Sequence, residues 1–269
     1  MSHAFHARRG TWIPLLALGL AACGGMPVEG TPSPETRPVS EINVQARIHT
    51  ELGAGYFSRG QYAVALQELK KAREADVGYA PAYNVLGLVH GELREDRQAE
   101  EFFRKAISLS PGYSEANNNF GLFLCQRDRA KEAMERFEAA LANPLYATPE
   151  KALANAGLCA LRGKELALAE GYLARALKRA PGLVSAQVGM ADVNFRQGRW
   201  LAARSLLRQA AEQGELGAQA LWVGLRVERN MADRESEASY AAQLRRRFPE
   251  SMQTQWLLTN QFDQPGSFL

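Results

Sequence analysis

The sequence predicts an all-α solenoid built from about six helix-turn-helix repeats. Small residues recur along the chain at steps of 34 to 36 residues, which is the signature of a repeated structural unit. Within each period, apolar residues fall three and four positions apart, as on the buried face of an amphipathic helix. A polar or glycine-bearing break divides each period in two, so each unit is expected to hold two helices.

The first element is a predicted signal peptide at residues 1–22. Two arginines precede an apolar stretch at residues 12–22, which is shorter than the roughly 20 apolar residues that span a bilayer. The stretch ends in LAAC, which resembles the lipobox of bacterial lipoproteins. This resemblance implies cleavage before Cys23 and lipidation of its thiol. An ordinary signal peptide cleaved after Ala22, with Cys23 incidental, is the alternative.

Residues 23–43 are expected to form a tether behind the lipidated Cys23. Met26–Ser40 carries four prolines together with Glu, Thr and Ser, a composition that favours extended polyproline conformations. Gly24 follows the cysteine, where aspartate in enteric lipoproteins signals retention in the inner membrane. We therefore expect the protein to face the periplasm from the outer membrane of a Gram-negative bacterium, with the lipid anchor as its sole membrane contact.

The predicted solenoid covers residues 44–260 and is followed by a C-terminal tail at 261–269. Each copy has a small residue, then an alanine twelve positions later, a large apolar residue after four more, and a second alanine after a further three. The small residues are Gly53, Gly87, Gly121, Gly157 and Ala191, and the large ones are Leu69, Phe103, Phe137, Leu173 and Leu207. The breaks are expected at Gly60, Asp96, Asp128, Gly163 and Gly198. The copies are expected near residues 46–79, 80–113, 114–147, 150–183, 184–216 and 217–249.

This unit resembles the tetratricopeptide repeat. The second copy carries the consensus residues Tyr83, Leu86, Gly87, Ala99, Phe103, Ala106 and Pro111. The resemblance implies a right-handed superhelix in which the first helix of each repeat lines the concave side. The sixth copy is degenerate, as is typical of a terminal repeat. Two extra residues near Asn143–Pro149 indicate a longer turn between the third and fourth copies.

The sequence holds no recognisable catalytic, metal or cofactor constellation. His49 and His90 stand alone on first helices, without the ligand spacing of a zinc site. Motifs of a nucleophile elbow, a phosphate-binding loop or a metalloprotease are missing. The 32 Lys and Arg residues nearly balance the 29 Asp and Glu residues, so nucleic acid is not an expected partner. We expect a non-enzymatic protein with no cofactor and no small-molecule substrate.

Two cysteines remain if Cys23 is lipidated. Cys125 and Cys159 lie 34 residues apart, in nearby positions of adjacent first helices, and the expected compartment is oxidising. The prediction is a disulfide that staples the third and fourth copies. Buried free thiols that fill small core positions are the alternative.

The concave face is the predicted protein-binding site. Positions that face it in tetratricopeptide proteins hold a row of apolar residues with polar residues between them. The predicted binding residues are Arg47, Phe57, Asn84, Leu88, Asn118, Leu122, Leu158, Leu161 and Phe195. Ordinary packing between helices is the alternative for each of them. A carboxylate clamp for chaperone tails is not evident, because Thr50 and Ala54 occupy its positions in the first copy.

Four stretches resemble a narrower family, the PilF/PilW lipoproteins of type IV pilus biogenesis. They are NNFGLFLC at 118–125, KALANAGLCAL at 151–161, MADVNFRQGRW at 190–200 and RRRFPES at 245–251. Members of that family are outer-membrane pilotins. The resemblance implies that the chain binds the pilus secretin subunit and supports its localisation and its assembly into multimers.

Two alternatives remain open. The chain could be a lipoprotein scaffold of another envelope machine, such as a tight-adherence pilus or the assembly of outer-membrane proteins. It could also be an enzyme or an enzyme regulator that acts on the cell wall and uses the repeats as a mount. A catalytic pair or a metal in the cleft would be required for this second alternative.

Overall fold

The structure, a computed structural model, describes residues 44–264, which form helices joined by turns. All of these helices belong to one compact unit, Pro34–Leu269. The predicted signal peptide, Cys23 and the tether lie outside the described residues, as does the end of the predicted tail, residues 265–269. The helices are α1 (Val44–Ser58), α2 (Tyr62–Ala75), α3 (Ala80–Glu92), α4 (Asp96–Leu109), α5 (Ser114–Gln126), α6 (Ala130–Leu141), α7 (Pro149–Arg162), α8 (Leu166–Arg179), α9 (Val184–Arg196), α10 (Trp200–Glu212), α11 (Ala218–Asn230), α12 (Arg234–Arg247) and α13 (Met252–Leu258).

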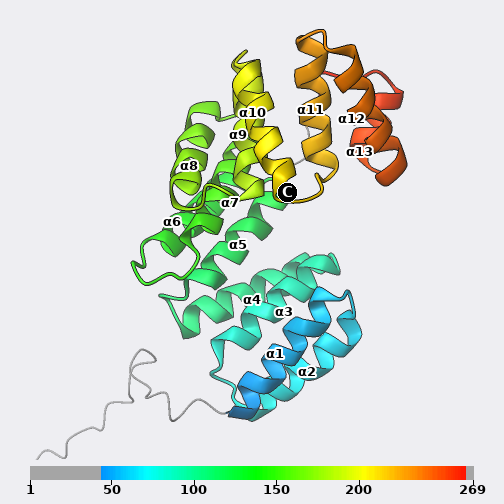
Figure 1. Cartoon of the computed structure of the whole chain (residues 1–269). Coiled ribbons are helices and arrows are strands. Elements are labelled where there is room, and N and C mark those ends of the chain that lie inside the picture. The colour runs from blue at the N-terminus through cyan, green and yellow to red at the C-terminus, as the bar shows by residue number, and fades with distance from the viewer. Residues whose placement is uncertain (1–43, 265–269) are drawn as a thin grey trace, which may run out of the picture. The chain divides into compact units, whose positions relative to one another are not determined.

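Successive helices pair into six hairpins within the described residues, from α1 with α2 to α11 with α12. The hairpins stack in chain order, and each packs on the one before it (Figure 1). Since no β-strand occurs within residues 44–264, the predicted all-α solenoid is confirmed.

Each hairpin closes where a small residue meets a large one. A Cβ added at Gly87 would lie 2.7 Å from the ring of Phe103, closer than real Cβ atoms approach. Gly121 has the same relation to Phe137, and both rings are fully buried. Glycine therefore lets the two helices of a hairpin cross in contact, while the large side chain fills the space beside the crossing.

Polar side chains near the start of three first helices hold the preceding loops. The Tyr83 hydroxyl donates a hydrogen bond to the carbonyl of Val77 at 3.0 Å. The amides of Asn117 and Gln187 donate to the carbonyls six residues before them, at 3.5 and 2.8 Å. The register between neighbouring hairpins is thus fixed by hydrogen bonds as well as by apolar packing.

Two features depart from the strict repeat. The connection between α6 and α7 takes in residues 142–148, and Pro149 begins α7, where its missing N–H costs nothing. Asn143 orders this connection, because its amide donates to the carbonyl of Gly112 and its oxygen accepts from the Leu145 N–H. The second feature is α13, a helix that the sequence analysis did not identify, which packs on α11 and α12.

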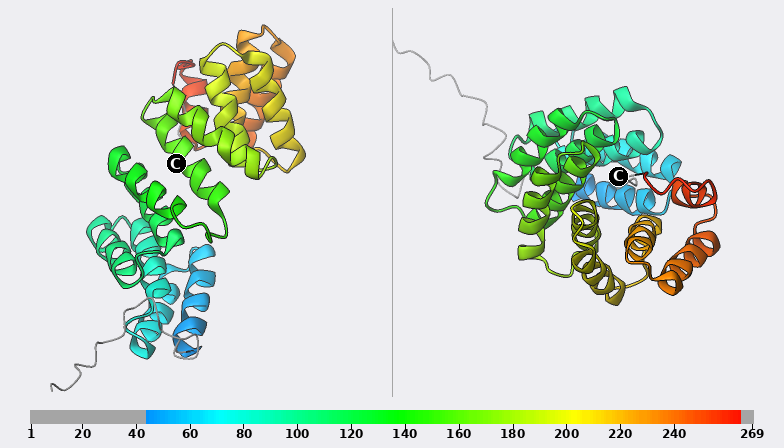
Figure 2. Two further views of the ribbon diagram at one scale, coloured as in Figure 1. Left: turned by 90° about the vertical axis from the view of Figure 1, so that its left-hand side faces the viewer. Right: turned by 90° about the horizontal axis from the view of Figure 1, so that it is seen from above.

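The first helices of the hairpins form an inner row and the second helices an outer row. Each first helix contacts the first helix of the next hairpin, whereas no comparable contact joins two second helices within residues 44–264. Because the inner helices lie closer together, the stack curves toward them, as the view from above in Figure 2 shows. We call the exposed side of α1, α3, α5, α7, α9 and α11 the inner face.

Candidate protein-binding face

The N-terminal half of the inner face carries a row of apolar side chains. Phe57 on α1, Leu88 on α3 and Leu122 on α5 are each half-buried, so part of every side chain remains open to solvent. The centres of the Phe57 and Tyr62 rings are 6.0 Å apart. Leu88 packs against the hydrophobic core with one part of its side chain and is exposed with the other. We call Phe57, Leu88 and Leu122 the apolar furrow.

A ladder of asparagine side chains lies beside the furrow. Asn119 donates to Asn84 at 3.2 Å, Asn118 donates to Asn119 at 3.4 Å, and Asn155 donates to Asn118 at 3.0 Å. The ladder ties α3, α5 and α7 together across three hairpins. Asn84 and Asn118, which the sequence places among the binding residues, are therefore buried hydrogen-bonding groups that hold the inner helices in place.

The furrow does not continue onto α7. Leu161 is only 1% exposed and Leu158 only 5%, so both residues belong to the core and their predicted role as a binding surface needs correction. The physical reason lies on the next inner helix, α9. A Cβ added at Gly189 would lie 2.6 Å from Leu158, so this glycine lets α9 approach closely enough to cover the leucine.

A buried cluster of charged residues joins the inner helices α9 and α11. Asp192 is fully buried and pairs with Arg196 at 2.6 Å and with Arg226 at 3.4 Å. Burial raises the pKa of the Asp192 carboxyl above its ordinary value, while the two guanidinium groups act in the lowering direction. Burial also lowers the pKa of Arg226. This cluster links α9 to α11.

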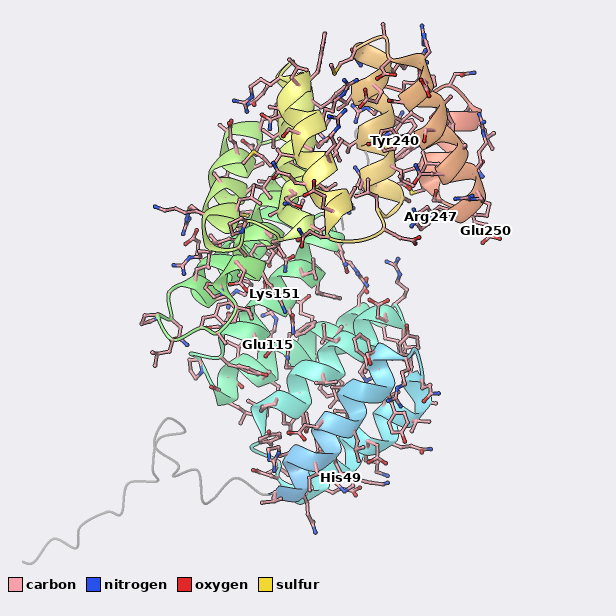
Figure 3. All side chains as sticks on the ribbon, in the orientation of Figure 1. His49, Glu115, Lys151, Tyr240, Arg247 and Glu250 are labelled. Carbon is pink, nitrogen blue, oxygen red and sulfur yellow. A yellow bond between two sulfur atoms is a disulfide. The ribbon has the colours of Figure 1, made fainter. Side chains whose placement is uncertain are left out.

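Phe195 and Arg47 complete the predicted binding residues. Phe195 is half-buried, and the Arg226 guanidinium lies 4.3 Å from the centre of its ring, so this phenylalanine is partly covered by a cation. Arg47 is exposed at the start of α1 and pairs with Glu51 at 3.0 Å. Figure 3 labels Glu115 on α5 and Lys151 on α7, exposed and oppositely charged residues at the starts of these inner helices.

The two cysteines lie under the inner face. In the structure, Cys125 at the end of α5 and Cys159 on α7 are joined by a disulfide, with their Cα atoms 5.9 Å apart. Both residues are almost fully buried. The disulfide predicted from the sequence joins the same pair. The bond reinforces the junction at which the longer connection between α6 and α7 interrupts the regular repeat.

The remaining candidate groups have ordinary partners. His49 Nδ1 lies 2.7 Å from a carboxylate oxygen of Glu68, and His90 pairs with Glu95. Residues 44–264 contain no group of three side chains that could hold a metal ion. Among the same residues, no helix has both the length and the apolar character needed to cross a membrane.

Sequence reasoning missed Asn119, Asn155 and Arg226. The run of three asparagines at 117–119 was a visible signal for a hydrogen-bonded cluster. Arg226 had no such signal, because its partner Asp192 is 34 residues away and its register in the degenerate last repeat was unclear.

The geometry agrees with what comparison with known proteins finds. Models of the tetratricopeptide repeat match residues 80–113, which hold α3 and α4, and residues 124–184. The type IV pilus assembly protein PilF of Pseudomonas aeruginosa PAO1 is 31% identical over 250 residues, which are 92% of this chain and 96% of that protein. The chain belongs to the PilF/PilW family.

Two solved structures of PilF/PilW proteins share this architecture. The crystal structure of PilW, described as a widely conserved type IV pilus biogenesis factor, has a TM-score of 0.70 and 31% identity, and the match covers 80% of this chain and 99% of that one. The structure of Pseudomonas aeruginosa PilF also has a TM-score of 0.70, with 30% identity over 80% of this chain and 97% of that one. As a PilF/PilW protein, the chain is a tetratricopeptide-repeat protein of type IV pilus biogenesis.

Proposed function

We propose that the chain is a pilotin, a lipid-anchored outer-membrane protein that binds the pilus secretin subunit and supports its localisation and multimer assembly. Membership of the PilF/PilW family supports a role in type IV pilus biogenesis. The observation that carries the binding role is the apolar furrow, in which Phe57, Leu88 and Leu122 stand half-exposed on three consecutive inner helices.

The furrow suits one elongated segment of a partner protein. Each of the first three hairpins contributes one apolar position, so a partner that follows the inner row would meet Phe57, Leu88 and Leu122 in turn. A side chain of this kind, once covered by a partner, commonly contributes more than about 1 kcal/mol to an interface.

The asparagine ladder and the disulfide preorganise this surface for binding. They connect α3, α5 and α7 before any ligand arrives, so binding need not order the inner helices first. Arg47, Glu115 and Lys151 supply a polar rim that can select the register of the bound segment.

The proposed anchor is Cys23, which lies outside the described residues. The LAAC sequence supports lipidation there, and the proline-rich residues behind it support a tether to the solenoid. The lipid would attach the solenoid to the membrane in which the secretin assembles.

The experiment that tests this proposal is co-purification of the full-length protein from outer membranes, with the bound protein identified by mass. We expect the pilus secretin. The Cys23→Ala variant is the control, because it should leave the outer-membrane fraction while its solenoid stays folded. Recovery of another envelope machine, or a Cys23→Ala variant that still fractionates with the outer membrane, would contradict the proposal.

A further inference from the structure

The longer connection between α6 and α7 forms one side of a hollow between the second helices α6 and α8. Asn143, Pro144 and Tyr146 of the connection line this hollow, and Leu141 and Leu153 add apolar surface to it. Its volume is about 470 Å³, within the roughly 300 to 1,000 Å³ typical of binding pockets. The departure from the strict repeat therefore creates a concave site that is large enough for more than a single ion.

Three cations of α8 line the other side of the hollow. Lys178 and Arg179 follow Arg175 by three and four positions, so all three side chains leave the helix on the same side. They are exposed, and none of them forms an ion pair within residues 44–264. The Arg175 guanidinium lies 5.3 Å from the centre of the Tyr172 ring. We call this site the basic hollow.

The helix dipole explains only part of this cluster. Basic residues in the last turn of a helix complement its negative end, which accounts for Lys178 and Arg179. Arg175 lies one turn earlier. The nearest candidates for a counter-charge are Glu138, which accepts a hydrogen bond from the tyrosine beneath Arg175, and Glu150 in the first turn of α7. Neither carboxylate forms an ion pair with the three cations in the described part of the chain.

Two other grooves between second helices have a different charge. The groove between α4 and α6 has Glu132 and Glu135 among its lining residues, and the groove between α10 and α12 has Glu215 and Glu228. Arginines line both grooves as well, so carboxylates of the protein itself offset their charge. The basic hollow has three cations and no acidic residue among the described residues that line it. Its charge is therefore left for a ligand to balance.

The connection that borders the hollow is held in place without a ligand. The Asn143 amide donates to the carbonyl of Gly112 at 3.3 Å, and the Tyr146 N–H donates to the carbonyl of Asn143 at 3.2 Å. Pro144 and Pro149 restrict the backbone at two further positions. A ligand therefore meets a preformed wall and does not have to order it.

We infer that the basic hollow binds an acidic segment of a partner protein that also carries an aromatic or aliphatic side chain. Carboxylates of the segment pair with Arg175, Lys178 and Arg179, and its apolar side chain packs on Leu141 and Tyr146. A peptide chain can enter a recessed site of this kind, whereas a flat membrane surface would stay at its rim. The cations lie on a second helix and the furrow on first helices, so this inference does not rest on the proposed function.

Fluorescence anisotropy with a defined peptide tests this inference. The probe is a labelled synthetic peptide with two aspartates on each side of one phenylalanine, and the full-length protein is titrated into it. The Arg175→Glu, Lys178→Glu variant should bind this peptide about tenfold more weakly, because like charges replace two ion pairs. The matched control is Lys105→Glu, Arg208→Glu, which reverses two exposed cations of α4 and α10 that form no ion pair within residues 44–264. It should leave the Kd unchanged.

Changes in the peptide separate the contribution of charge from that of the apolar side chain. Replacing the aspartates by lysines should abolish binding to the unaltered protein. Replacing the phenylalanine by alanine should weaken binding by about fivefold, as expected when an apolar anchor is lost from an interface. Circular dichroism would confirm that both protein variants keep their helices, which is expected because all four substituted residues are exposed.

Two results would contradict the inference. It is wrong if the unaltered protein does not bind the peptide, or if both variants bind the peptide with the same Kd. If vesicles that contain an anionic phospholipid bind through Arg175 and Lys178 while the peptide does not, the basic hollow is a site for a lipid headgroup and the proposed occupant is wrong.

Discussion

At the scale of single residues, the turns of the hairpins show how strongly the repeat constrains the backbone. Gly60 and Gly198 adopt left-handed φ values of 71° and 74° at the turns of the first and fifth hairpins. At the same place in the second and fourth hairpins stand Arg94 and Lys164, with φ values of 61° and 64°. Side chains with a Cβ are held there in a conformation that costs roughly 1 to 2 kcal/mol.

Lys164→Gly should therefore stabilise the protein by roughly 0.5 to 1 kcal/mol, because the relieved strain exceeds the extra chain entropy of glycine in the unfolded state. Denaturant unfolding measures the change. Lys105→Gly, at an exposed position inside α4, is the matched control and should destabilise by about 1 kcal/mol. Changes of the same sign in both variants would contradict this account of the turn.

The sequence located these turns to within two residues. The predicted breaks at Gly60, Asp128 and Gly198 are themselves left-handed residues, whereas those predicted at Asp96 and Gly163 lie one or two residues from the left-handed Arg94 and Lys164. Glycine is the natural choice for such a conformation, yet Gly163 has an ordinary φ of −72°. The register of the repeat, which puts the left-handed residue seven positions after the small one, outweighs the local preference.

The sequence also did not predict which individual positions on the inner helices are buried. Leu122 and Leu158 follow the small residue of their repeats at the same distance, so the repeat pattern predicts both as binding residues. They differ because Gly189 brings α9 down onto Leu158, whereas Leu122 keeps part of its surface open. Such a difference depends on how closely two helices approach, which spacing alone does not specify.

At the scale of helices, the junction between α5 and α7 is the one with both an irregular connection and a covalent staple. The disulfide closes a loop with a sequence separation of 34 residues. A bond across a loop of this size restricts the unfolded chain and typically contributes about 2 to 4 kcal/mol.

The Cys125→Ala, Cys159→Ala double variant should thus unfold at a lower denaturant concentration, with a loss of about 2 to 4 kcal/mol. Reduction of the unaltered protein should reproduce most of this loss without any substitution. If the reduced and oxidised proteins unfold at the same denaturant concentration, the bond contributes nothing to stability.

The six hairpins were predictable from the sequence because each is defined by spacings within 34 to 36 residues. α13 was not, because it is only seven residues long and has no repeat partner to reveal it. The chain after it packs on α11 through Phe262, which stacks on Trp222 and lies 3.9 Å from the Arg229 guanidinium. These contacts join residues 40 and 33 positions apart, and no second copy of them occurs elsewhere in the repeats to reveal them from the sequence.

At the scale of the whole solenoid, the two ends differ in how far their apolar side chains are covered. The last hairpin is covered by α13 and by residues 259–264, where the Trp222 indole N–H donates to the carbonyl of Gln264. The first hairpin leaves Ile48 and Leu52 exposed. The half-exposed apolar side chains of the furrow lie on α1, α3 and α5, in the N-terminal half of the solenoid.

We propose that the apolar furrow supports assembly of the pilus secretin. The most direct measurement is the ratio of multimeric to monomeric secretin in outer membranes of cells that carry the Phe57→Glu, Leu88→Glu variant. A matched control is the Leu168→Glu, Leu201→Glu variant, which makes similar substitutions at exposed positions of the outer helices α8 and α10. Both proteins should be folded by circular dichroism and present in the membrane in equal amounts.

We predict that the furrow variant lowers the secretin multimer ratio several-fold, because two buried anchors that each contribute more than about 1 kcal/mol are lost from the interface. The control variant should leave the ratio unchanged. A normal multimer ratio in the folded furrow variant would contradict the account and move secretin binding to another face of the solenoid.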